Sequence, residues 1–200
     1  MTQFIPFQYD GLAHAVILTL GAAVAGLIGL RRHRLANHGP ALTWTAGLTV
    51  VALLGYEVQI LFRQAAEKGK SEACYSNLRV MGVAISKYVQ VKGRYPDANL
   101  WRDEIGLYLS GEDAATIFRC PGSSSTSYYA YNPAMSSIST ERIERPADTV
   151  VLSDSRVDGI GGASDVDRNR HIGGCFLLMA DGKPRWWSVR NTPRDITWTP

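Results

Sequence analysis

The last third of the sequence carries a histidine and an aspartate whose spacing raises the question of a site, in the stretch RHIGGCFLLMADGKPRWW. His171 stands before a short apolar run, and Asp181 and Gly182 follow that run. An Asp-Gly pair after such a run is typical of a two-residue β-hairpin turn. We therefore expect His171 and Asp181 to fix a hairpin through side-chain bonds to the backbone, with Gly182 in its turn, and we expect no catalytic residue.

A second group of chemical interest is a set of carboxylates on the glycine-rich segment SDSRVDGIGGASDVD. Carboxylate oxygens on a flexible loop suit calcium, although the spacing here is not that of an EF-hand. We expect a solvated loop, with a calcium site as the alternative. The aspartates of this segment are Asp154, Asp158, Asp165 and Asp167.

Two apolar runs near the start of the chain indicate a membrane anchor. Residues 12–30 contain no Asp, Glu, Lys or Arg and approach the ~20 residues that a spanning helix needs, and residues 41–62 form a second run. We expect a transmembrane helical hairpin over residues 1–63. The connection between the runs carries Arg31, Arg32 and Arg34, which favours a cytoplasmic loop. Residues 64–200 then form a periplasmic domain at a bacterial inner or intracytoplasmic membrane.

The first apolar run also contains residues that offer contacts inside the membrane. Gly21, Ala25 and Gly29 recur every four residues, a pattern of small side chains that lets helices pack closely. They pack either the hairpin on itself or the hairpin against another subunit. His14 is a polar group in the same run, for which we expect interfacial hydrogen bonding, with a haem or pigment ligand as the alternative.

The second apolar run shows no helix terminator at its end. Apolar residues continue at three- and four-residue spacing, which predicts one helix over residues 41–91, ended by Gly93 and Pro96. Later runs at residues 150–152 and 176–179 predict buried strands. The expected fold is α+β, with the long helix packed on a small antiparallel sheet. Cys175 directly precedes the last of these runs, in the same apolar strand, and is expected to be a buried core residue.

The order of motifs resembles the pilin-like proteins of bacteria, in particular the pseudopilin-type group with a His-x9-Asp-Gly signature. The resemblance rests on CYSNLRVMGVAISKYVQVKGRYP, RCPG, YYAYN and the segment from His171 to Gly182. It implies a disulfide between Cys74 and Cys120, which would join the helix to a loop. Lys183 stands where the family's turn usually has histidine, and the basic leader of a prepilin is not found. We therefore expect an anchored protein that does not form a filament.

The charge balance argues against one class of partner and does not identify another. Residues 71–200 hold 15 Lys and Arg against 15 Asp and Glu, which gives no reason to expect a nucleic acid as partner. We expect a non-enzymatic structural subunit of a larger inner-membrane complex, photosynthetic, respiratory or secretory, in contact with other subunits and with lipid, and with no resident cofactor. The alternatives are a type II secretion-like pseudopilin and a calcium- or ligand-binding periplasmic sensor.

Overall fold

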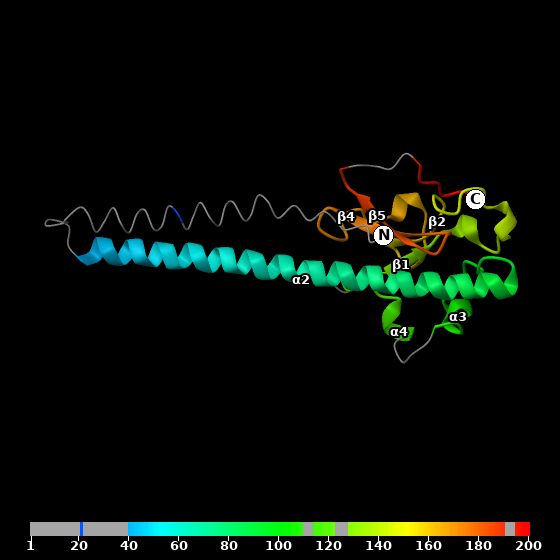
Figure 1. Ribbon diagram of the computed structural model, residues 1–200, viewed down its shortest axis with the longest axis horizontal. Helices are drawn as coiled ribbons and strands as arrows, with labels where there is room; N and C mark the ends of the chain where they lie inside the picture. The colour runs from blue at the N-terminus through cyan, green and yellow to red at the C-terminus, as the bar shows by residue number, and fades with distance from the viewer. Residues whose placement is uncertain (1–20, 22–39, 110–113, 123–127, 191–194) are drawn as a thin grey trace. The chain divides into compact units, whose positions relative to one another are not determined.

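The computed structural model describes Gly21 and residues 40–109, 114–122, 128–190 and 195–200, with the backbone alone for residues 40–46. The chain divides into two compact units, Met1–Ala65 and Ala66–Pro200. All the strands of the described residues belong to the second unit, which is α+β (Figure 1).

The longest element is helix α2 (Pro40–Lys92), 53 residues long, which matches the single helix that the sequence predicts over residues 41–91. Its part in the second unit has a buried stripe at helical spacing, which packs against the sheet. The stripe consists of Cys74, Leu78, Met81, Ile85 and Tyr88. The helix ends where Gly93 takes a φ of 68° and donates its N–H to the Val89 carbonyl at 2.8 Å. A glycine is favoured there because a left-handed residue at a helix end strains any side chain with a Cβ.

The sheet has five strands in the order β3-β1-β2-β4-β5. The strands are β1 (Tyr128–Tyr131), β2 (Val150–Ser155), β3 (Gly159–Ile160), β4 (Gly174–Met179) and β5 (Pro184–Ser188). β4 and β5 form the hairpin that the Asp-Gly dipeptide predicts. The sheet is mixed and not purely antiparallel as expected, because the two-residue strand β3 pairs parallel with β1.

The two faces of the sheet hold different groups of side chains. A register shift between Val150 and Leu152 makes Val150 pair with Met179, and Leu152 with Leu178. Alternation along a strand then places Asp154 on the same face as Leu152, the face that helix α2 covers. The opposite face carries a second core of Val150, Val166, Cys175, Leu177, Met179 and Trp187.

Short elements complete the second unit. Helix α3 (Trp101–Gly106) buries Trp101, whose Nε1 donates to the Gly159 carbonyl at 3.0 Å, and helix α4 (Ala114–Ile117) precedes Cys120. Three 3-10 helices follow at Pro133–Met135, Thr140–Arg142 and Ala163–Asp165. The last residues of the chain also pack on this unit, since the Val150 N–H donates to the Thr197 carbonyl at 3.0 Å.

The expected transmembrane hairpin over residues 1–63 is contradicted. Among the described residues, no helix is long and apolar enough to cross a membrane. The second apolar run lies in helix α2, where Glu57 and Gln59 interrupt its apolar side chains. The first expected arm, residues 12–30, lies outside the described residues except for Gly21.

Candidate metal centre

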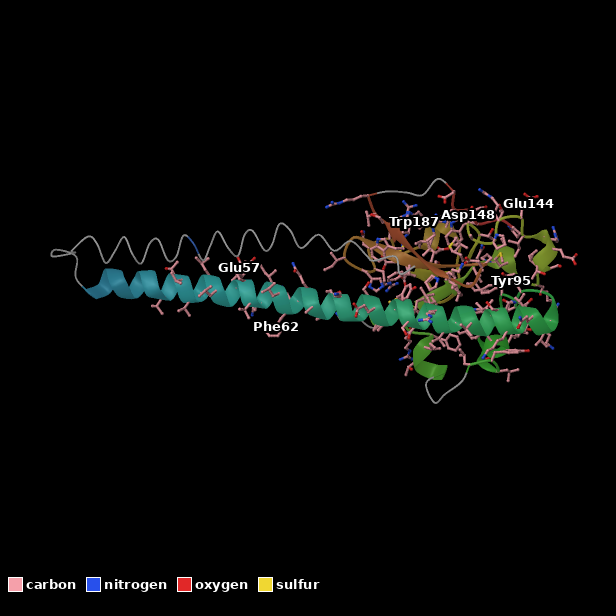
Figure 2. All side chains as sticks on the ribbon, in the orientation of Figure 1. Glu57, Phe62, Tyr95, Glu144, Asp148 and Trp187 are labelled. Carbon is pink, nitrogen blue, oxygen red and sulfur yellow. The ribbon has the colours of Figure 1, made fainter. Side chains whose placement is uncertain are left out.

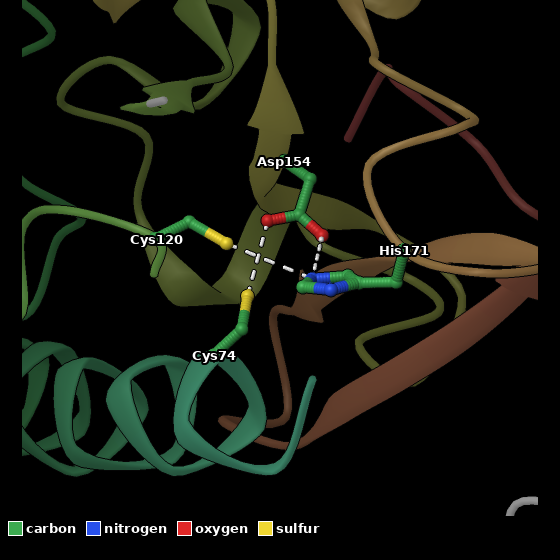
Figure 3. Close-up of side chains that lie close together, drawn as sticks. All are labelled: Cys74, Cys120, Asp154 and His171. Carbon is green, nitrogen blue, oxygen red and sulfur yellow. Dashed lines mark hydrogen bonds and ion pairs between the residues drawn. The ribbon is translucent and has the colours of Figure 1, made fainter. Parts of the chain in front are cut away.

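Four polar side chains from four different segments meet inside the second unit (Figure 3). Cys74 comes from helix α2, Asp154 from the central strand β2, Cys120 from the segment after helix α4, and His171 from the loop before β4. The possible ligand atoms of the four, two sulfurs, a carboxylate oxygen and a ring nitrogen, all lie within 4.8 Å of one another. We call these four residues the C2DH cluster.

Close contacts connect the members of the cluster. Cys74 Sγ lies 3.2 Å from Asp154 Oδ1, and His171 Nε2 lies 3.4 Å from Asp154 Oδ2. Cys120 Sγ lies 3.6 Å from the same His171 Nε2. The side chains point toward one shared centre, as Figure 3 shows.

The cluster lies in the interior. Cys74 and Asp154 have no exposed surface, and Cys120 and His171 are each 4% exposed. A cavity of about 340 Å³ that the described residues form has Arg156, Ser164 and Arg168 in its wall, and no member of the cluster lines it. The cluster is therefore shielded from solvent.

Each of the three acidic members accepts a hydrogen bond from outside the cluster. The Phe176 backbone N–H donates to Asp154 Oδ2 at 2.7 Å, the Tyr129 hydroxyl lies 3.2 Å from Cys74 Sγ, and the Gly122 N–H lies 3.4 Å from Cys120 Sγ. Donors aimed at buried sulfur and carboxylate atoms stabilise their anionic forms. These contacts also fix the direction of each side chain.

The environment shifts the acidity of these groups. Hydrogen bonding from Cys74 is the main effect that lowers the pKa of Cys120, to about 6, and His171 contributes in the same direction. Burial raises the pKa of Cys74 well above its usual value. Burial alone would lower the pKa of His171, but the hydrogen bonds and charges of Asp154 and Cys120 outweigh it and raise the pKa to about 9. One thiolate and one imidazolium therefore form readily at neutral pH.

This arrangement of groups permits three kinds of chemistry. Two thiols, a carboxylate and an imidazole together form a complete ligand set for a soft divalent metal ion. Two close thiols can also form a disulfide, although Cys74, Cys120 and Cys175 all carry free thiols in this structure. A thiolate beside a histidine that an aspartate orients is also the arrangement of a cysteine nucleophile, but here it is buried.

The structure separates the residues of the His-x9-Asp-Gly signature. The His171 side chain joins the C2DH cluster, while its backbone pairs with Gly174. Asp181 lies at the other end of β4, in the turn, where its Oδ1 accepts the Lys183 N–H at 3.1 Å. Gly182 takes a φ of 79°, which a glycine adopts without strain.

The four aspartates proposed for calcium are not brought together. Asp154 is buried in the cluster, whereas Asp158 pairs with Arg102 on the surface. Asp165 Oδ2 accepts the Gly162 N–H at 2.9 Å, and Asp167 lies 3.4 Å from Arg170.

The remaining sequence candidates are His14, Gly21, Ala25, Gly29 and Cys175. His14, Ala25 and Gly29 are outside the described residues, and a Cβ added at Gly21 would meet nothing within 4 Å. Cys175 is fully buried in the second core, and burial raises the pKa of its thiol.

Sequence reasoning missed Asp154 as a partner of the cysteines and of His171. Asp154 is the fifth residue of an otherwise small or apolar strand, VVLSDS, and a carboxylate inside a buried strand is a signal for a site. Comparison with protein-family models, with curated proteins and with solved structures gives no match.

Proposed function

We propose that this protein is a non-enzymatic structural subunit whose α+β unit is held closed by an internal cross-link at the C2DH cluster. The observation that carries the proposal is that four segments far apart in the chain each place one polar side chain in the same buried position. Burying four polar groups costs free energy unless they satisfy one another. A cross-link that joins helix, loop, strand and hairpin would satisfy these four polar groups.

Burial of the cluster supports a structural role over catalysis. A nucleophilic cysteine needs access for its substrate, and Cys120 is 4% exposed while Cys74 is fully buried.

The test is the coupling between cluster members in the free energy of unfolding of the full chain, measured in urea. Single alanine substitutions at Cys74 and at His171 are each expected to be destabilising. The double variant is expected to lose about 1–3 kcal/mol less free energy of unfolding than the sum of the two single losses, because either change alone breaks the cross-link. Cys175→Ala, in the core on the opposite face, serves as the matched control and is expected to add to His171→Ala without coupling. Additive losses for Cys74 and His171 would contradict the proposal.

A second feature supports membership in a larger assembly. The first part of helix α2 exposes large apolar side chains, with Val51 67%, Val58 49% and Phe62 73% exposed. Phe62 is labelled on this helix in Figure 2. Val58 and Phe62 follow Val51 by seven and eleven residues, so all three lie on one face of the helix. Large exposed apolar patches mark contacts with other proteins, membranes or ligands. We propose that this face contacts another subunit of the assembly.

The native mass of the purified assembly tests this second point. The double variant Val51→Asp, Phe62→Asp is expected to reduce the mass of the assembly. Charges placed in an apolar contact lose their hydration without gaining partners. Gln59→Asp adds a charge at an exposed polar position of the same helix and is the control. Equal masses for the two variants would contradict the assignment of this face.

A further inference from the structure

We propose that the C2DH cluster binds one zinc ion, with Cys74 Sγ, Cys120 Sγ, His171 Nε2 and a carboxylate oxygen of Asp154 as its four ligands. This inference deepens the proposed function, because it rests on the cluster being a cross-link and names the group that makes the link.

The distances between the donor atoms match those of a tetrahedral zinc site. With Zn–S bonds of about 2.3 Å and Zn–N or Zn–O bonds of about 2.1 Å, tetrahedral angles put a sulfur about 3.6 Å from a nitrogen or oxygen. The observed contacts are 3.6 Å between Cys120 Sγ and His171 Nε2, and 3.2 Å between Cys74 Sγ and Asp154 Oδ1. All four ligand atoms lie within 4.8 Å of one another, so shifts on the order of 1 Å bring them to tetrahedral separations.

The donor set selects zinc among the common ions. Calcium and magnesium prefer oxygen ligands and do not use thiolates, so the two cysteines exclude them. Zinc accepts sulfur, imidazole nitrogen and carboxylate oxygen in one tetrahedron. Four protein ligands with no open position are the mark of a structural zinc site, in agreement with the burial of all four residues.

The surroundings of the ligands have the form of a supporting shell. The hydrogen bonds from Phe176, Tyr129 and Gly122 each reach a different anionic ligand. Such outer donors orient metal ligands and tune their charge. The Nδ1 atom of His171 is buried and has no hydrogen-bond partner among the described residues. The ring therefore makes its polar contacts through Nε2, the atom that faces the centre.

The rival occupant of the same position is the Cys74–Cys120 disulfide that the family resemblance implies. A disulfide would use the two sulfurs only and would leave the carboxylate and the imidazole buried beside an apolar bridge. Zinc uses all four groups, and its two positive charges offset two of the three negative charges of the thiolates and the carboxylate. The zinc site therefore explains Asp154 and His171, which the disulfide does not.

The first experiment uses the unmodified full-length protein, purified without chelator. We expect about one zinc per chain by elemental analysis. X-ray absorption at the zinc edge should show two sulfur ligands and two nitrogen or oxygen ligands. Replacement by cobalt should produce thiolate-to-cobalt charge-transfer bands and the strong visible bands of tetrahedral cobalt. These readouts need no substitution, so they remain valid if a variant fails to fold.

Variants then assign the ligands. Cys74→Ser, Cys120→Ser, Asp154→Asn and His171→Gln are each expected to lower zinc affinity by at least about 100-fold, because each removes a ligand. Cys175→Ser and Asp158→Asn are matched controls outside the cluster and should keep full zinc content. Loss of zinc from the controls, or its retention in all four ligand variants, would overturn the assignment.

The outcomes separate failure of the zinc site from failure of the proposed function. A protein that binds no zinc after reduction, but in which Cys74 and His171 remain coupled in unfolding, would overturn the zinc site and leave the cross-link in place. Free thiols, no zinc and no coupling between Cys74 and His171 in unfolding would overturn both.

Discussion

Gly82 of helix α2 and Gly182 of the β4–β5 turn are in direct backbone contact, so the hairpin turn is seated on the helix. A Cβ added at Gly82 would lie 2.4 Å from the Gly182 carbonyl oxygen and 2.9 Å from Leu178 Cδ1. The Asp-Gly turn is therefore required for more than reversing the chain. It lets helix and sheet approach closely at a point away from the C2DH cluster.

Gly82→Ala is expected to lower the free energy of unfolding by roughly 1–3 kcal/mol, since overpacking against backbone is hard to relieve. Alanine at Gly69, in the same helix, meets nothing within 4 Å and is expected to stabilise by up to about 1 kcal/mol through helix propensity. Urea unfolding followed by tryptophan fluorescence measures both. The contact would be refuted if the two variants changed stability alike.

Gly122→Ala is expected to disturb the cluster without removing a ligand. A Cβ there would lie 2.5 Å from His171 Cε1 and 2.8 Å from His171 Nδ1, so the ring must move. We expect zinc affinity to fall by about 10–100-fold, the usual effect of disturbing the surroundings of a ligand. Gly106→Ala, where a Cβ meets nothing within 4 Å, is the control for competition titrations with a chelator. Unchanged affinity in Gly122→Ala would mean that the ring position does not matter.

Asp154→Ala is expected to be among the most destabilising single changes in the second unit. It removes a fully buried carboxylate and leaves the Phe176 N–H and the His171 ring without their partner. Breaking a buried charged pair costs roughly 3–5 kcal/mol. Asp158→Ala breaks the exposed pair with Arg102 and should cost less than about 1 kcal/mol. Thermal unfolding of the full chain compares the two variants. Similar losses of stability would show that Asp154 contributes no more than an exposed aspartate.

Local patterns predicted much of the fold. The helix from Pro40 to Lys92 follows from helical spacing up to a glycine and a proline, and the β4–β5 hairpin follows from Asp181-Gly182. The strand β3, two residues long and parallel to β1, has no pattern of its own, because its pairing depends on a contact made by the rest of the sheet. The predicted membrane hairpin over residues 1–63 rests on the length and apolar content of two runs and on the arginines between them.

The candidate site was the harder part to predict. The sequence places Cys74 in the buried stripe of a helix and His171 before a strand, but it does not indicate that the two side chains meet. Asp154 was assigned to a solvated loop because its neighbours include Asp158 and several glycines. The structure extends the strand through Ser155, and this buries Asp154. Which polar residues meet across 97 positions of sequence is set by how helix and sheet pack, and one sequence does not reveal it.

Asn132 is expected to be a strong contributor to stability away from the cluster. Its Nδ2 donates to the Val150 carbonyl at 2.8 Å and to the Trp198 carbonyl at 2.9 Å, and its Oδ1 accepts the Ala134 N–H. Asn132→Ala removes a helix cap and leaves two carbonyls unpaired, at a cost of about 2–4 kcal/mol. Asn99→Ala, an exposed asparagine, is the control in urea unfolding. Proteolysis should also release the C-terminal residues sooner in Asn132→Ala, and an unchanged cleavage rate would contradict their docking through Asn132.

Cys175 is expected to be the least reactive thiol in the zinc-free, reduced protein. It has no exposed surface, and burial raises the pKa of its thiol, so the native protein presents neither the access nor the thiolate that alkylation requires. Cys120, whose pKa is lowered to about 6, is already ionised at pH 7.5 and should react during smaller openings of the structure. Alkylation by iodoacetamide, followed by peptide mass spectrometry, should label Cys120 first and Cys175 only at the rate of global unfolding. In urea the order should disappear, because unfolding gives all three thiols similar pKa values. Labelling of Cys175 ahead of Cys120 under native conditions would show that the second core opens more easily than the cluster, against the packing described above.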